Sequence, residues 1–222
     1  MKTNDFLKRE WIFWILILAP AVFAIYHWPH IPDKVPTHWN ASGEVDEYGG
    51  KWAAFLSPMI NLGVYFLLLL IPKIDPRKKN YDLFSGAYWM IRVSLSVLFC
   101  MLGFVTILAA LGVAMNVGLI IMVSVLLLFT VMGNQFGRIR PNYFVGIRTP
   151  WTISNEEVWT KTHRLGGRIW VIASAIMLPL VFFIPTQLMG IVFIVYVLVI
   201  AAIPIVYSYV LHKQITNKGT EK

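Results

Sequence analysis

The sequence predicts an all-α, polytopic membrane protein with about six transmembrane helices and with both termini in the cytoplasm. Of its 222 residues, 58% are hydrophobic and only 14% are charged, whereas a soluble domain usually keeps charged residues near a quarter of its length. The hydrophobic residues gather into long runs, and the basic residues gather on one side of those runs. We therefore expect lipid to be the solvent for most of the chain.

Six apolar runs are each close to the ~20 residues that a helix needs to cross a bilayer. They are continuous and do not alternate in polarity as barrel strands do, so helices satisfy the backbone within the lipid. The predicted spans cover residues 11–28, 52–71, 88–111, 115–132, 169–184 and 188–210.

The first run follows basic residues, as the apolar part of a secretory signal peptide does. It is long, no obvious cleavage site follows it, and further spans come after it, so we expect an uncleaved helix. The third run holds Cys100, which has no second cysteine for a disulfide and is expected to be a small buried hydrophobe. Arg92, near the predicted cytoplasmic start of that run, is expected to reach lipid phosphate by snorkelling.

Lysine and arginine are distributed unevenly between the two sides of the predicted bundle. All but two of the 19 lie in the N-terminus, the second loop with the start of the third span, the fourth loop, or the C-terminal tail. The two exceptions are Lys34 and Lys51 in the first loop. Because cytoplasmic loops are enriched in Lys and Arg, we expect the first loop outside and both termini inside, which requires an even number of spans.

The first loop, residues 29–51, is predicted to form a compact external cap. Pro29, Pro32 and Pro36 oppose helix formation, residues 40–43 indicate a turn, and the part after the turn is acidic. Histidines and a carboxylate can bind zinc, but no fixed metal motif is matched, so we interpret them as ordinary loop residues and leave their response to pH open. These residues are His27, His30, Asp33 and His38.

The fourth loop, residues 133–168, interleaves basic and aromatic residues. Ser154 followed by Glu157 is a capping-box pattern, which predicts a short helix that ends at Gly166-Gly167. Trp159 and His163, four residues apart, would share one face. Either this helix anchors at the lipid headgroups or the loop also docks a protein partner. The candidate contact residues are Arg138, Arg140, Asn142, Arg148, Trp151, Trp159, His163 and Arg164.

The motifs of both loops are similar to those of a known family. Residues 146–152, 155–159 and 162–167, preceded by residues 140–145, resemble the signature of SdpI-type membrane proteins. Residues 36–40 with Gly43 and Asp46 resemble the small DUF1648-like membrane domain usually found before it. Residues 75–77 and 80–81 fit the same pattern. The expected domains are an N-terminal membrane hairpin, 1–83, and an SdpI-like four-helix region, 84–222, with the basic cytoplasmic loop 133–168.

The resemblance implies an immunity protein of the bacterial plasma membrane. Such proteins protect a producing cell from its own secreted membrane-active toxin, and the best-known members also hold a cytoplasmic transcriptional repressor at the membrane. The implied partners are therefore the lipid bilayer, a peptide or protein toxin on the outer face and a repressor inside, without direct nucleic-acid binding. The candidate toxin-facing residues are His38, Trp39, Asn40, Glu44 and Asp46.

Catalysis and transport are the other functions to weigh. No H-E-x-x-H, P-loop or G-x-S-x-G motif is present, so we expect no enzyme and no catalytic, cofactor-binding or metal-binding residue. A transporter of a small molecule or ion usually has ionisable or broken-helix features near the midplane. Arg92 is the one charge within a predicted run, and Asn61 and Asn116 define no pathway. Transport remains the alternative to immunity.

Overall fold

The computed structural model describes residues 3–40 and 42–220, with side chains for residues 9–40 and 42–217. Lys2, Lys222 and Ala41, used above for orientation and for the turn, lie outside the described residues, as do the side chains of Lys8 and Lys218. Within this part the predicted fold class is confirmed. Six helices are long and apolar enough to cross a membrane, and the sheet has two strands.

Each predicted span corresponds, in order, to one long helix. These helices are α1 (Thr3–Tyr26), α2 (Leu56–Ile74), α4 (Ser85–Ala110), α5 (Val117–Phe136), α7 (Glu156–Leu180) and α8 (Thr186–Thr220). The shorter elements are η1 (Trp28–His30), β1 (Lys34–Trp39), β2 (Val45–Gly50), η2 (Lys51–Phe55), α3 (Asn80–Leu83), α6 (Pro150–Ser154) and η3 (Val181–Phe183).

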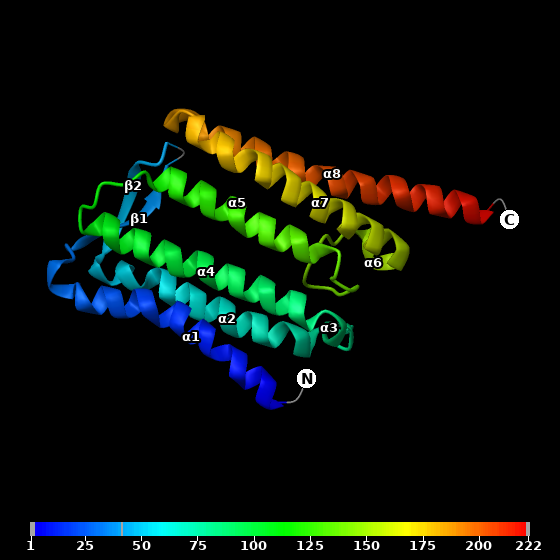
Figure 1. Cartoon of the computed structure of the whole chain (residues 1–222), viewed down its shortest axis with the longest axis horizontal. Coiled ribbons are helices and arrows are strands. Elements are labelled where there is room, and N and C mark those ends of the chain that lie inside the picture. Colours follow the sequence, from blue (N-terminus) through cyan, green and yellow to red (C-terminus); the bar gives the residue numbers. More distant parts are fainter. Residues whose placement is uncertain (1–2, 41, 221–222) are drawn as a thin grey trace.

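The six long helices form two groups of three that meet between α4 and α5. Helices α1 and α2 pack against α4, while α7 and α8 pack against α5. Figure 1 shows the β1–β2 hairpin at one end of the bundle, and α3, α6 and both chain ends at the other. We call these the hairpin end and the basic end, since the second carries the arginine-rich loop 137–149. Buried apolar clusters lie at both ends, around Val35 and Ile107 and around Tyr81 and Trp159.

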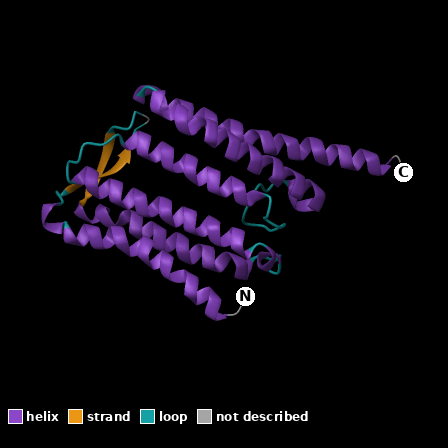
Figure 2. Cartoon of the chain, viewed as in Figure 1, coloured by secondary structure: helices purple, strands orange, loops and turns teal. Residues whose placement is uncertain are grey.

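The first loop folds as a β-hairpin, shown in orange in Figure 2, where the sequence predicted only a compact cap. Strands β1 and β2 are antiparallel, with Lys34 opposite Gly50 and Trp39 opposite Val45. The prolines that oppose helix formation do not prevent this pairing, because Pro36 lies in a two-stranded sheet next to an irregularity in the register. The hairpin packs against η2 and α4.

The prediction of a short helix ending at Gly166-Gly167 is wrong. Helix α7 begins after Asn155, whose Oδ1 accepts from the backbone N–H groups of Glu157 and Val158 at 2.9 and 3.0 Å. The helix then continues through both glycines to Leu180. The capping box belongs instead to Thr149 and Thr152 at the start of α6.

The glycines serve helix packing rather than helix termination. A Cβ atom on Gly167 would lie 2.5 Å from the carbonyl oxygen of Gly133 on α5. A Cβ atom on Gly133 would lie 2.9 Å from the carbonyl oxygen of Gly167. Small residues let membrane helices approach closely, and here they hold the α5–α7 contact together.

The expectation that Arg92 snorkels to lipid phosphate is also wrong. Arg92 is 4% exposed, and its Nη1 and Nη2 donate to the two carboxylate oxygens of Glu10 on α1, at 3.0 and 2.7 Å. Glu10 is itself 5% exposed. Sequence patterns could not pair residues 82 positions apart, whereas a buried charge within lipid needs such a partner.

Candidate functional site

At the hairpin end, Asn40 organises the turn between β1 and β2. Its Oδ1 accepts from the backbone N–H groups of Ser42 and Glu44, at 2.9 and 3.0 Å. Gly43 has a φ of +79°, in the left-handed region that favours glycine. The turn predicted at residues 40–43 is therefore present in the described part, and Asn40 gives it its shape.

His38 and Asp46 face one another from the two strands. His38 Nδ1 lies 2.6 Å from Asp46 Oδ1, and both side chains are well exposed. The hydrogen bond to Asp46, followed by the charge of that carboxylate, raises the pKa of His38 above its ordinary value of 6.5. The two predicted residues thus form one charged pair when the imidazole is protonated.

The other histidines of this region do not join that pair. The rings of His27 and His30 lie 6.4 Å apart between centroids, and His27 packs against Phe23 and Tyr26. Among the residues that the structure describes, no group of three or more His, Cys, Asp or Glu is placed to hold a metal ion. Metal binding by His27, His30 and His38 gains no geometric support.

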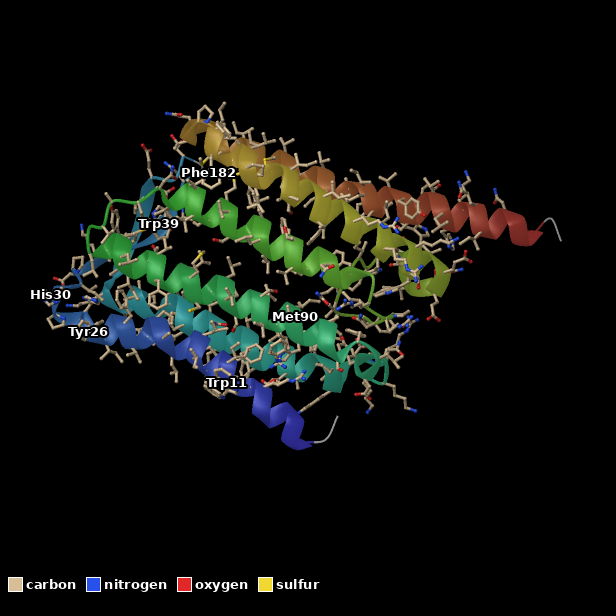
Figure 3. The ribbon with its side chains drawn as sticks, viewed as in Figure 1. Trp11, Tyr26, His30, Trp39, Met90 and Phe182 are labelled. Atoms are coloured by element: carbon tan, nitrogen blue, oxygen red, sulfur yellow. The ribbon has the colours of Figure 1, made fainter. Side chains whose placement is uncertain are left out.

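A cavity of about 290 Å³ is lined by residues of β1, η2, α2, α4 and α5. His38 and Trp39 of β1 are among its lining residues, and Figure 3 shows Trp39 at the hairpin end of the molecule. The other lining residues are mostly apolar and lie far apart in the sequence. They include Leu56, Ile60, Phe99, Leu102, Val105 and Ile121.

The cavity and the hairpin together give a surface with two kinds of chemistry. The interior can take up an apolar side chain or a short apolar segment. The hairpin carries the exposed carboxylates Glu44, Asp46 and Glu47, which are not among the residues that line the cavity. Of the candidate toxin-facing residues, His38 and Trp39 line the cavity, Asn40 shapes the turn, and Glu44 and Asp46 lie on the exposed hairpin.

At the basic end, Asn142 fixes the loop between α5 and α6. It is fully buried, and its Nδ2 donates to the carbonyl oxygens of Arg140 and Val145, both at 2.9 Å. Its Oδ1 accepts from the backbone N–H groups of Phe144 and Val145. All the polar atoms of this side chain are therefore used within the protein.

Trp159 and His163 lie on one face of α7, as their spacing predicted, but that face is buried. Their rings stack 4.1 Å apart, and they are 0% and 1% exposed. Trp159 Nε1 donates to the carbonyl of Ile139 at 2.9 Å. His163 Nε2 accepts from the backbone N–H of Ile147 at 2.9 Å, and Nδ1 faces the carbonyl of Trp159. Neither ring reaches the headgroups or offers surface to a partner.

The remaining candidates of the basic loop are exposed or partly exposed. Arg138, Arg140, Arg148 and Arg164 are exposed, and Tyr143 and Phe144 between them are 40% and 37% exposed. Trp151, in α6, packs against Tyr209 of α8 with ring centroids 5.0 Å apart. The loop thus exposes cations and aromatic rings, while Asn142, Trp159 and His163 beneath them are buried.

Sequence reasoning gave no site role to Asp75, which ties the second loop to the fourth. This residue is 2% exposed, and its Oδ2 accepts from Tyr81 Oη at 2.9 Å and from the backbone N–H of Tyr143 at 3.0 Å. Burial, and then the bond to Asp75, raises the pKa of Tyr81 far above its ordinary range. An acidic residue shortly after the second apolar run, directly before Pro76, was the signal available.

Two family models match this chain, one over the region that contains the hairpin and one over the region that contains most of the basic loop. Residues 138–208 match the model of the SdpI/YfhL protein family, and residues 15–62 match a domain of unknown function, DUF1648. Over 211 residues the chain is 25% identical to the immunity protein SdpI of Bacillus subtilis (strain 168), across 95% of this chain and 99% of that protein. No solved structure matches the chain.

Proposed function

We propose that this chain, an SdpI-type membrane protein with a DUF1648 region near its N-terminus, protects a bacterial cell from a secreted membrane-active toxin. It is a multi-pass protein of the plasma membrane. The observation that carries the proposal is the apolar cavity beneath the acidic hairpin, within a chain similar over nearly its whole length to an immunity protein.

The proposed orientation places the hairpin end outside the cell. The arginines of loop 137–149 and the cations of the second loop gather at the basic end, and the positive-inside tendency assigns such an end to the cytoplasm. The cations of the second loop there are Arg77, Lys78 and Lys79. A secreted toxin would then meet the hairpin and the mouth of the cavity before it reached the inner part of the bundle.

The proposed mechanism is binding rather than catalysis. An amphipathic, cationic toxin segment would place an apolar side chain in the cavity, where burial of apolar surface favours binding. Its cations would lie beside Glu44, Asp46 and Glu47, which are exposed on the hairpin. Toxin held in this way is not free to insert into the surrounding bilayer.

Signalling to a cytoplasmic repressor is the second part of the proposal. The cavity is lined by α4 and α5, and α5 leads directly into the basic loop. Toxin binding can shift the arrangement of these helices only by its differential affinity for two states. Arg138, Arg140, Arg164 and the exposed ring of Phe144 would then form the repressor-binding surface.

Expression in a sensitive bacterium tests the immunity proposal. Cells with and without the protein are exposed to culture supernatant of the bacterium that encodes it and, in parallel, of Bacillus subtilis strain 168. We expect survival to rise at least tenfold in a supernatant that kills the cells without the protein. Equal killing in both strains, with normal membrane levels of the protein, would contradict the proposal.

The repressor proposal needs a separate readout. Arg140→Glu reverses an exposed charge, while the bond from Asn142 to this residue uses only its backbone carbonyl. Lys213→Glu at the end of α8 is the control. We expect Arg140→Glu to leave survival unchanged but to reduce toxin-dependent recruitment of a repressor to the membrane several-fold. Equal recruitment by both variants would remove the loop from signalling.

A further inference from the structure

We propose that a second ligand site, at the basic end between α1, α2 and α4, binds the phosphate-bearing headgroup of an anionic phospholipid. The site is a cavity of about 530 Å³ at the opposite end of the bundle from the hairpin. It is separate from the proposed toxin cavity, and nothing in the proposed immunity function uses it.

The cavity lies where three candidate membrane spans begin or end, which is the depth at which we expect lipid headgroups. Its lining includes Arg9, where the first candidate span begins, Lys73, near the end of the second, and Ser85, where the third begins. Leu68, Leu69 and Pro72 supply its apolar wall. The neighbouring Leu67 and Leu70 on α2 are about half exposed. A ligand with a polar head and an apolar tail fits this gradient.

Two buried hydrogen-bond donors on residues that line the cavity have no partner within the described part of the chain. Arg92 uses Nη1 and Nη2 on Glu10, but its Nε has no acceptor, and neither has Trp89 Nε1. Arg92 is 4% exposed. The two residues are three positions apart on α4 and so share one face. Both groups can only donate, so a ligand group that reaches them must supply acceptors.

The charged residues that line the cavity favour an anionic ligand. The carboxylate of Glu10 is neutralised by Arg92 in their two-bond pair. Arg9 and Lys73 then face only one further carboxylate in the lining, that of Asp82. The lining therefore carries one net positive charge. Basic pockets between membrane helices at the cytoplasmic side are suited to anionic headgroups, and a phosphodiester provides both the charge and the acceptor oxygens.

Lipid binding by the full-length protein, purified in a nonionic detergent, tests the proposal. Phosphatidylglycerol, phosphatidylcholine and inorganic phosphate are titrated separately, and bound lipid is counted by native mass spectrometry while the unfolding midpoint is recorded. We expect phosphatidylglycerol to bind at least tenfold more tightly than phosphatidylcholine and to raise the midpoint. Equal binding of the two lipids, or an equal effect of inorganic phosphate, overturns the proposal.

Two variants locate the site, and a third serves as the control. Trp89→Phe removes the N–H donor but keeps a ring, and Lys73→Gln removes one cation without touching the Glu10–Arg92 pair. Lys79→Gln removes a cation that lines a different cavity at the same end. We expect each of the first two to weaken phosphatidylglycerol binding about fivefold and the control to leave it unchanged. If Lys79→Gln weakens phosphatidylglycerol binding equally, the effect is one of general surface charge, and the assignment of the site is overturned.

Discussion

His163 shows how single side chains fix the shape of the basic loop. Its Nε2 accepts from the Ile147 N–H, so the proton must lie on Nδ1, which donates to the Trp159 carbonyl. Gly146 lies beside the Nε2 edge of this ring with a φ of +110°, and a Cβ atom there would overlap Nε2. The imidazole thus acts as a neutral bridge between the loop and α7.

For single residues, the sequence predicted which side chains lie close together better than it predicted which side chains are exposed. The spacing of Trp159 and His163 correctly placed them on one face, and Gly43 and Asn40 correctly marked a turn. Whether a face is covered depends on residues distant in the chain, such as Ile139 over Trp159. Local patterns therefore could not tell a buried frame from a contact surface.

The His38–Asp46 pair predicts a pH dependence at the hairpin end. Because its folded-state pKa is raised above 6.5, protonated His38 contributes stability that is fully present below pH 6.5. That contribution is lost as the pH rises through the raised pKa. Histidine NMR of the purified protein should therefore give His38 a pKa above 6.5.

Two variants check the cause of that shift. Asp46→Asn should return the His38 pKa close to its ordinary value, since Asp46 supplies both the hydrogen bond and the main charge. Glu47→Gln should lower it much less, because Glu47 is the weakest of the contributing groups. A His38 pKa that is unchanged by Asp46→Asn would refute the pairing.

At the scale of elements, the apolar runs predicted all six spans, but the start of α7 was misjudged. The first half of α7 is polar and continues the same helix out of the apolar run, so hydropathy alone shortens it. The hairpin was missed for a different reason. Its strands are short and contain proline and glycine, and they are held by contacts with α4 and η2 that the sequence does not display.

The contact between α5 and α7 depends on Gly167. Gly167→Ala would place a methyl group 2.5 Å from a backbone oxygen that cannot rotate away, and overpacking of this kind typically costs about 1–3 kcal/mol. We expect a clearly lower thermal unfolding midpoint in detergent. Gly63→Ala, in α2, is the matched control because its methyl group would meet nothing within 4 Å in the described part of the chain. Equal midpoints for the two variants would show that the helices are not in close contact there.

For the whole molecule, the structure brings six spans into two groups of three and leaves both chain ends at one end (Figure 1). The uneven distribution of Lys and Arg predicted that both termini lie at the same end. Such an arrangement requires an even number of spans. The pairing of α4 with α1 and α2 as well as α5 had no signature in the sequence. The division into regions 1–83 and 84–222 stays a prediction.

The orientation in the membrane can be measured with cysteine labelling. Cys100→Ser gives a cysteine-free background, because the chain has one cysteine. In that background we expect Tyr48→Cys, on the hairpin, to react with a membrane-impermeant maleimide in intact cells. Arg140→Cys should react only after the cells are permeabilised. The reverse pattern would place the acidic hairpin in the cytoplasm and end the proposal that it meets a secreted toxin.

The central claim is that the cavity beneath β1 receives the toxin, and Trp39→Ala tests it most directly. Trp39 lines the cavity, whereas Tyr48, an exposed aromatic residue of the same hairpin, does not. Loss of an aromatic anchor commonly costs about 1 kcal/mol or more of binding energy, roughly fivefold to tenfold in affinity. In the survival assay, at equal membrane levels, Trp39→Ala should therefore shift the tolerated toxin dose down about tenfold, while Tyr48→Ala should retain full protection. Full protection by Trp39→Ala would contradict the account.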